Sequence, residues 1–401
     1  MVNVREIRAE AESLHAQLVA WRRDLHRHPE LGFEEERTAA LIAQHLHTLN
    51  FDQVRTGIAQ TGVVALLKGA HPGPTVMLRF DMDALPVEEE NDVPYRSEVP
   101  GKMHACGHDG HVAIGLGVAT LLARHRTEMH GQVKLVFQPA EEGLGGAKRM
   151  VEEGVLDTPR PDVVFGLHVW NPLPSGYVAI QEGPLMAAAG KFDIEIVGRG
   201  GHSAQPHLTV DPIVVAAQVI NAIQSIVSRN LDPLESLVIS VGELHAGAAF
   251  NVIPGQAILR GTLRAFSDNV MHMAQSRLRS LAEGIAQAHG ARAIVLAETI
   301  APPLLNHPRA TAIAKEAAQH LLGEERIVRI KPVMVAEDVA EFLSRVPGCF
   351  MLLGIRNEAK GLVYGHHHPR FDIDEDVLPL GVALLSTTTL LAGERWENNG
   401  R

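Results

Sequence analysis

The residues of this 401-residue chain that best suit chemistry are cysteine, histidine and carboxylate side chains gathered in a few short segments. Cys106 and His108 are separated by a single glycine, and His168 ends an apolar run. Two adjacent carboxylates, Glu141 and Glu142, follow another apolar run. Thiolate, imidazole and carboxylate are the groups that bind first-row divalent metals in proteins. The sequence therefore predicts a metal site built from these segments.

Each of these signals is weak when it is taken alone. A lone histidine such as His168 is more often a hydrogen-bonded structural residue, and Cys106 alone is most often a buried apolar side chain. The histidines at 366–368 can equally form a solvated loop. The metal site is favoured because these residue types recur at predicted strand ends, where ligands bind in open α/β sheets.

The adjacent pair Glu141 and Glu142 predicts a division of labour. Neighbours on irregular backbone point in different directions, so one carboxylate can bind a metal while the other faces a water molecule. A metal lowers the pKa of water, and a nearby carboxylate can accept the proton, which suits hydrolysis of an unactivated amide. We therefore expect an amide hydrolase.

Alternating strands and helices must position these residues. Helices are expected over the first 28 residues and at 34–49. Further along the chain, apolar β-type runs at 61–67, 75–80, 132–137, 162–167 and 349–353 alternate with helical stretches near 109–125, 145–152, 336–345 and 375–392. This order predicts an α/β catalytic domain with a mainly parallel sheet.

The middle of the chain has a different order of elements. A strand near 192–196 is followed by a helix at 213–227, strands at 236–243 and 252–265, a helix at 268–289 and a strand at 292–298. This β-α-β-β-α-β order is that of the ferredoxin-like fold. We expect residues 187–300 to form an inserted domain, with residues 1–186 and 301–401 forming the catalytic domain on either side of it.

The composition excludes several classes of protein. A content of 46% hydrophobic and 21% charged residues is that of a globular protein, and the net charge of −11 disfavours nucleic acid as a partner. Cys106 and Cys349 are far apart in sequence, so no disulfide framework is expected. The N-terminal segment lacks a signal-peptide core and no later run reaches about 18 uncharged apolar residues, which predicts a cytoplasmic protein without a membrane partner.

Seven segments, taken in order over nearly the whole chain, resemble those of the hippurate hydrolase, N-acyl-amino-acid amidohydrolase and auxin-conjugate hydrolase group of the aminoacylase-type metallopeptidase family. They are DLHRHPELG at 24–32, DMDALP at 81–86, HACGHDGH at 104–111, QPAEEG at 138–143, GGHSA at 200–204, NVIPG at 251–255 and HHP at 367–369. At two positions this chain differs from the wider family. The wider family has His-x-Asp where this chain has Asp81-Met82-Asp83, and a carboxylate where this chain has Cys106. The hippurate hydrolase group has the same residues as this chain at both positions.

The resemblance implies a zinc-peptidase-like catalytic domain that binds two divalent metal ions, which can be zinc, manganese, cobalt or nickel. The implied metal ligands are Cys106, His108, Glu142, His168 and His367. It further implies that Glu141 acts as general base and then acid, and that Asp83 orients a metal ligand. The implied reaction cleaves an N-acyl or N-aroyl amino acid to a carboxylic acid and an amino acid.

The same resemblance implies that the inserted domain is a lid and a dimerisation module, which makes a homodimer or higher homo-oligomer the expected state. His202 would reach an active site, that of the partner subunit, and stabilise the tetrahedral oxyanion. Asn251 and Arg264 would bind the substrate carboxylate. For His202 the alternative is a tight turn, and for Arg264 a charge on the face of a strand.

Three other functions stay open. A cysteine hydrolase would use Cys106 as nucleophile and His108 or His104 as base, and would need no metal. A non-catalytic metal-binding protein would leave Glu141 without a role. Within the favoured class, a dipeptidase or carboxypeptidase is the alternative to an N-acyl-amino-acid hydrolase.

Overall fold

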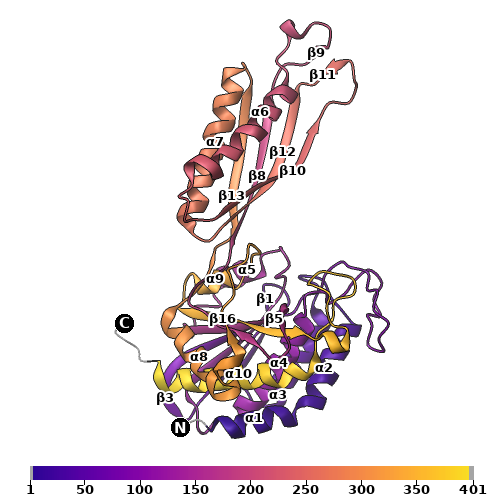
Figure 1. The fold of residues 1–401 in the computed structure, drawn as a ribbon. Helices are drawn as coiled ribbons and strands as arrows, with labels where there is room; N and C mark the ends of the chain where they lie inside the picture. Colours follow the sequence, from indigo (N-terminus) through magenta and orange to yellow (C-terminus); the bar gives the residue numbers. More distant parts are fainter. Residues whose placement is uncertain (1–2, 397–401) are drawn as a thin grey trace. The chain divides into compact units, whose positions relative to one another are not determined.

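The computed structural model describes residues 3–396, and the chain divides into two compact units (Figure 1). Unit 1 comprises the residues up to Gly183, Leu305–Lys331 and those from Glu341 onward, and unit 2 comprises Pro184–Leu304 and Pro332–Ala340. The short second piece of unit 2 was assigned from the sequence to the larger domain. It joins unit 2 because the backbone N–H of Ala187 donates to the carbonyls of Val333 and Val335.

Unit 1 is built on an eight-stranded sheet whose central four strands are parallel. In spatial order the strands are β1 (Gln53–Ile58), β2 (Gly62–Lys68), β4 (His130–Gln138), β3 (His71–Asp81), β5 (Val163–Pro174), β16 (Gly348–Arg356), β6 (Val178–Ala179) and β15 (Ile327–Val328). The central strands are continuous apolar runs because helices cover both faces of a parallel sheet. This confirms the predicted α/β architecture with a mainly parallel sheet.

Helices pack around this sheet (Figure 1). They are α1 (Val4–Ser13), α2 (His15–Arg27), α3 (Glu36–Thr48), α4 (His108–Arg124), α5 (Gly146–Glu152), α8 (Pro308–Leu322), α9 (Ala340–Leu343) and α10 (Leu378–Arg395). Residues 4–27 form two helices, α1 and α2, separated at Leu14, in place of the single helix expected at the start of the chain. Helices α4 and α10 approach each other closely at Gly117. A Cβ on Gly117 would lie only 2.6 Å from the Val382 side chain, so a larger residue there would push the two helices apart.

Unit 2 has the predicted ferredoxin-like order of elements. These are β8 (Ala188–Val197), α6 (Pro212–Ser225), β10 (Leu237–Ala246), β12 (Gln256–Ala265), α7 (Asp268–Ala288) and β13 (Arg292–Ala301). The strands form an antiparallel sheet in the order β10-β12-β8-β13, and α6 and α7 pack on it over an apolar core. The strand expected at 252–265 is interrupted by Pro254 and Gly255, because proline cannot donate to a strand ladder.

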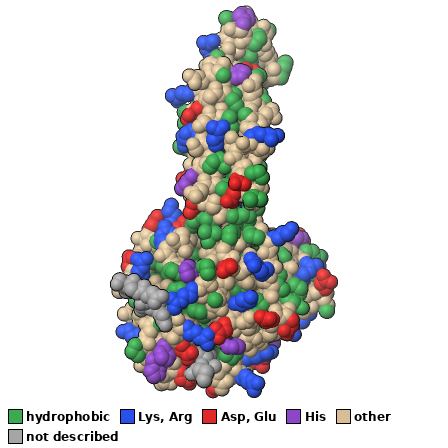
Figure 2. All heavy atoms as spheres, turned by 60° about the vertical axis from the view of Figure 1, so that its left-hand side comes forward, with side chains coloured by type: hydrophobic (Ala, Val, Ile, Leu, Met, Phe, Trp, Pro, Cys, Tyr) green, Lys and Arg blue, Asp and Glu red, His purple; other side chains and the backbone are tan. Residues whose placement is uncertain are grey.

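Two helical segments are long and apolar enough to cross a membrane by length and composition alone, Pro212–Asn230 and Glu375–Arg395. The second is 89% buried inside the fold, so its apolar composition is that of a core helix. On the face of the molecule seen in Figure 2, positive and negative side chains are interspersed and form no continuous basic patch.

Candidate metal centre

Asp83 connects two of the candidate ligand segments in unit 1. It follows the end of β3, and its Oδ1 lies 3.2 Å from Nδ1 of His108, whose Nδ1 also lies 2.9 Å from the Asp83 carbonyl. Its Oδ2 accepts a hydrogen bond of 3.0 Å from the backbone N–H of Glu142. Nδ1 of His108 is therefore occupied. Nε2 of His108 is buried and has no hydrogen-bond partner among the residues described, which is the state of an imidazole nitrogen that a metal would satisfy.

Cys106 lies on the loop just before α4, facing His168. Gly107 caps the helix at φ 91°, and a Cβ there would lie 2.4 Å from Val169, so only glycine fits. His168 donates from Nδ1 to the Val169 carbonyl at 2.6 Å, and its Nε2 lies 3.5 Å from Sγ of Cys106. His168 lies within β5 rather than at its end, because β5 continues well past the residues that pair with β3.

Burial controls the protonation of these two ligands. Burial raises the pKa of the Cys106 thiol, and the charge of Glu142 raises it further. Burial also lowers the pKa of His168 well below its usual range. The thiol is thus neutral without a cation beside it, and a divalent ion would favour the thiolate. The donor set fits a soft or borderline metal such as zinc.

Glu142 and His367 bring a carboxylate and an imidazole to the same place. His367 lies on the loop after β16 with a left-handed backbone, φ 66°, and its Nε2 lies 3.3 Å from Oε1 of Glu142. Candidate ligand atoms of Cys106, Glu142 and His367 all lie within 4.8 Å of one another, and so do those of His108, Glu141 and Glu142. The two groups share Glu142, which suits two adjacent ions.

A third group of candidate ligand atoms contains two residues that the sequence did not predict as ligands, Asp81 and His111, together with His108 and His168. Asp81 accepts from Arg79 at 2.7 Å and also pairs with Nδ1 of His111. Nε2 of His111 accepts from the backbone N–H of Val169 at 2.9 Å. Both nitrogens of His111 are occupied by protein partners, so His111 supports the site without offering a ligand atom.

The three late histidines have different surroundings. His366 is buried against Trp170 and Phe371, its Nε2 accepts from Asn171, and burial lowers its pKa to about 3. His368 is exposed and its Nδ1 accepts from a backbone N–H nearby. Nδ1 of His366 lies 4.0 Å from Sγ of Cys106, and Nε2 of His367 faces the Glu142 carboxylate, so these contacts separate His368, but not His366, from the candidate ligands.

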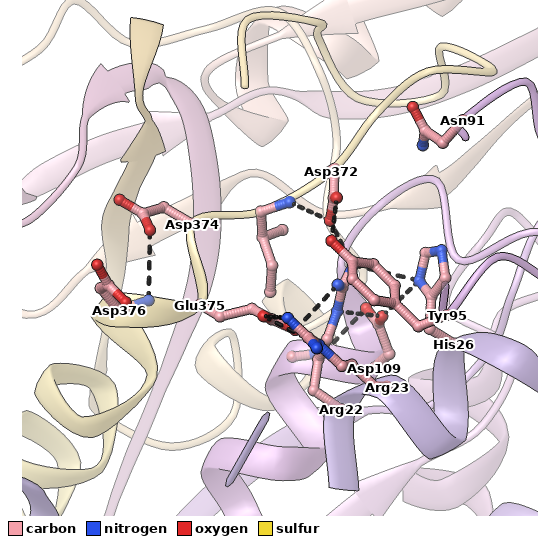
Figure 3. Close-up of polar contacts among 12 residues, drawn as sticks. Arg22, Arg23, His26, Asn91, Tyr95, Asp109, Asp372, Asp374, Glu375 and Asp376 are labelled. Carbon is pink, nitrogen blue, oxygen red and sulfur yellow. Dashed lines mark hydrogen bonds and ion pairs between the residues drawn. The ribbon is translucent and has the colours of Figure 1, made fainter. Parts of the chain in front are cut away.

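A buried network of charges lies behind the ligands, centred on Arg22 of α2 (Figure 3). The guanidinium of Arg22 lies 2.8 Å from Asp109, 2.7 Å from Asp372 and 3.3 Å from Glu375. His26 also lies 2.7 Å from Asp109 through Nδ1. Although burial opposes ionisation, Arg22 and His26 hold the pKa of Asp109 well below its usual range.

This network joins the two chain segments that carry candidate ligands. Asp109 is the second residue of α4, directly after His108, and Asp372 continues the loop that carries His367. Neither Arg22 nor Asp109 stands out in the sequence by its own type or spacing, although Asp109 lies in the segment 104–111 and Arg22 lies two residues before the segment 24–32.

His104 is not placed to act as the base of a cysteine nucleophile. Both of its ring nitrogens are buried without a hydrogen-bond partner in the described part of the chain, and burial lowers its pKa to about 4. Cys106 and His104 therefore lack the hydrogen-bonded pairing that activates a thiol.

The candidate residues of unit 2 fall into two groups. His202 lies in β9 (Gly201–His202), which pairs with β11 (Val252–Ile253) next to Asn251, and its Nδ1 accepts from the backbone N–H of Ala204. Arg264 lies near the far end of β12, about 26 Å from the start of that strand at 3.3 Å per residue. Within one copy of unit 2, Arg264 is therefore not part of the group formed by His202 and Asn251.

The chain is similar to known proteins over most of its length. Residues 77–390 match the peptidase family M20/M25/M40. Thermostable carboxypeptidase 2 of Saccharolobus solfataricus is 42% identical over 94% of this chain and 96% of the relative, and IAA-amino acid hydrolase ILR1-like 4 of Arabidopsis thaliana is 41% identical over 92% and 83%. The crystal structure of the YXEP protein of Bacillus subtilis, described as a dinuclear metal binding peptidase from the M20 family, superimposes with a TM-score of 0.84 at 35% identity, over 95% of this chain and 99% of that one.

Proposed function

The chain belongs to peptidase family M20/M25/M40 and is a metal-dependent amidohydrolase, and we propose that its substrates are N-acyl or N-aroyl amino acids. Hydrolysis would release a carboxylic acid and an amino acid. The observation that carries this proposal is the position of the adjacent Glu141 and Glu142, whose carboxylates share a group of candidate ligand atoms with His108. One carboxylate can then bind a metal while the other carries the proton, an arrangement that suits metal-assisted hydrolysis of an amide.

We propose that Cys106, His108, Glu142, His168 and His367 hold two divalent ions, which can be zinc, manganese, cobalt or nickel. When bound, these ions supply a Lewis acid and lower the pKa of water. Support comes from Nε2 of His108, which has no hydrogen-bond partner within residues 3–396, and from the close approach of Cys106, Glu142 and His367.

The proton transfers are assigned to Glu141. Its carboxylate would accept a proton from the attacking water and return it to the leaving amine, because the amine must be protonated to depart. Asp83 would hold His108 and the backbone of Glu142 in fixed positions through its two carboxylate oxygens. Glu141 is thus the general base and then the general acid, and Asp83 is a positioning residue.

The residues of unit 2 are assigned to the substrate. His202 would stabilise the oxyanion, and its exposed ring can donate from Nε2 because Nδ1 accepts from Ala204. Asn251 and Arg264 would bind the substrate carboxylate. Since Arg264 lies far from His202 and Asn251 in one copy, we assign His202 and Asn251 to the active site of a second copy in a homodimer or higher oligomer.

Two alternatives follow from specific observations. The relative named as a carboxypeptidase favours a peptide substrate, since its sequence is as similar as that of the amino acid hydrolase. A Cys106-dependent hydrolase with His104 as base is disfavoured, because neither ring nitrogen of His104 has a hydrogen-bond partner among the described residues. The same enzyme with His108 as base would need no metal, so metal removal distinguishes it from the proposed function. We also propose a cytoplasmic location, where a reducing environment keeps the Cys106 thiol free.

The proposal is tested with metal-stripped protein supplied again with zinc, manganese, cobalt or nickel. Release of amino acid is measured from N-acetyl, N-benzoyl and longer N-acyl amino acids and from dipeptides. We expect activity only with metal, and a loss of at least about 10²-fold in kcat for Glu141→Ala with two ions still bound. Full activity of the stripped protein would contradict the two-metal mechanism, and activity on dipeptides alone would identify a peptidase.

A further inference from the structure

Ala140, which immediately precedes Glu141, has a backbone conformation that L-residues rarely adopt. Its φ is 56°, in the left-handed region. Such a residue costs conformational energy and persists only where its surroundings hold it. The direction of the Glu141 side chain depends on this turn, because Glu141 is the next residue along the chain.

Several contacts hold the turn from 139 to 146. The backbone N–H of Gly146 donates to the Ala140 carbonyl at 3.0 Å, and that of Gly143 donates to the Glu141 carbonyl at 2.6 Å. A Cβ on Gly146 would lie only 1.7 Å from the Pro139 carbonyl oxygen, so the chain can return past Pro139 only through a glycine. The turn is therefore closed by its own backbone on one side.

On its other side the turn is held by a carboxylate from a distant part of the chain. Oε1 of Glu35, just before α3, accepts a hydrogen bond of 2.8 Å from the backbone N–H of Ala140. Oε2 of Glu35 accepts from the Thr61 hydroxyl at 2.5 Å. Glu35 is fully buried, and burial raises its pKa to about 7. A buried carboxylate is costly, and the reaction itself uses Glu35 for no proton or metal.

We infer that Glu35 is a positioning residue for Glu141, because its hydrogen bond to the Ala140 amide holds the left-handed backbone that aims the Glu141 carboxylate. The inference rests on the proposed function, in which Glu141 is the general base. Glu35 lies 105 positions from Ala140 in the sequence, so only folding brings the two together.

The test compares Glu35→Ala, Glu35→Gln and the double variant Glu35→Ala with Ala140→Gly. We expect Glu35→Ala to lower kcat by about 10- to 100-fold, with KM and the number of bound metal ions unchanged, because a misdirected catalytic group slows only the chemical step. Glu35→Gln keeps an oxygen for the Ala140 N–H and should stay within about 3-fold of wild type. Glycine adopts positive φ without steric cost, so Ala140→Gly should restore most of the lost kcat.

Asp162→Ala is the matched control. Oδ2 of Asp162 accepts at 2.8 Å from the backbone N–H of Thr75, so this bond also joins a carboxylate to a backbone amide far away in the sequence. It lies just before β5 and near the start of β3, whereas the candidate ligand segments follow the other ends of the strands. We expect Asp162→Ala to leave kcat unchanged, which would show that the loss of kcat in Glu35→Ala does not follow from removing any carboxylate–amide bond.

The outcomes distinguish this inference from the proposed function. Wild-type kcat in Glu35→Ala, beside an inactive Glu141→Ala, would overturn the role of Glu35 alone, whereas an active Glu141→Ala would overturn the proposed function. A loss in Glu35→Ala that Ala140→Gly does not reduce would make Glu35 merely structural. If Glu35→Ala does not fold, Glu35→Asp, with a carboxylate one methylene shorter, is tested with the same rescue.

Discussion

The two units of this chain bury different kinds of side chain. The core of unit 2 is apolar, with Phe192, Ile194 and Ile196 of β8 packed beneath its two helices. Among the described residues of both units, the buried charged side chains lie in unit 1, except for Glu337 and Asp338. In unit 2, ion pairs such as that of Arg260 with Asp193 lie on the exposed surface.

This difference follows from what each unit has to hold in place. An apolar core is sufficient to pack helices on a sheet, and unit 2 needs no more for its fold. Burying a charge costs free energy unless it is paired, and directional contacts fix the angles of side chains in a way that apolar packing does not. Unit 1 thus contains buried charges, which are unfavourable unless paired, in the region where the imidazole, thiol and carboxylate side chains of the candidate site have to be oriented.

The largest expected effect comes from removing the centre of the buried network. Arg22→Met leaves Asp109 and Asp372 buried without their cation, which should lower the free energy of unfolding of unit 1 by about 3 to 5 kcal/mol. Zinc affinity should fall by about 10- to 100-fold, because Asp109 adjoins His108. Urea unfolding of the metal-free protein and competition with a chromophoric chelator measure the two effects.

Arg260→Met is the control for that prediction in unit 2. Arg260 pairs with Asp193 and Glu243 on an exposed surface, where ion pairs contribute little, so neither the urea midpoint nor zinc affinity should change. Equal urea midpoints for Arg22→Met and Arg260→Met would contradict the claim that the ion pairs of the two units contribute differently to stability.

A smaller effect is expected in the pH dependence of stability. Nζ of Lys134 is buried and donates to the carbonyls of Val155 and Pro159, and burial lowers its pKa to about 8. Between pH 8 and the unfolded value of 10.5 the unfolded chain binds more protons, so stability should rise with pH by about 1 to 2 kcal/mol after solvent screening. The rise should be absent in Lys134→Met.

Lys191 of unit 2 provides the matching test. Its ammonium is exposed and pairs with Glu298, which raises its pKa. In chemical unfolding experiments, the stability of Lys191→Met should therefore rise between pH 8 and 10 as much as that of the wild type. A rise that survives in Lys134→Met would show that the buried lysine is not its source.

The smallest expected change in the free energy of unfolding comes from apolar core residues, and it should be equal in the two units. Ile114 of α4 and Ile194 of β8 are both fully buried among apolar neighbours. Replacing either with valine should cost about 0.5 to 1.5 kcal/mol, because a deleted methyl group leaves the same kind of gap in either core. A clear difference between Ile114→Val and Ile194→Val would mean that the units differ in apolar packing as well as in charge.

The periodicity of the sequence predicts the order of elements well. Alternating apolar runs indicated both the parallel sheet and the β-α-β-β-α-β unit, because helix and strand periods are local properties. The two-residue strands β6 and β15 and the assignment of 332–340 to unit 2 depend on distant partners and leave no such local pattern.

The candidate site was predictable to a similar extent. The pairs Cys106 with His108 and Glu141 with Glu142 stand out because their members are close in sequence. Glu35 does not stand out, since its partner at Ala140 is brought to it only by folding. The candidate ligands stand out in the sequence by residue type and spacing, whereas a residue such as Glu35, which contacts the turn that carries two of the candidates, does not.

The tight passage of Gly146 past Pro139 sets a limit on laboratory evolution of this enzyme. Any side chain at position 146 would meet the carbonyl oxygen of Pro139, so a randomised library loses nearly every member that carries a change there. Positions 139 to 146 are best left unchanged, and other positions should be randomised instead. Selectivity for new acyl groups can then be sought without altering the turn that carries both glutamates.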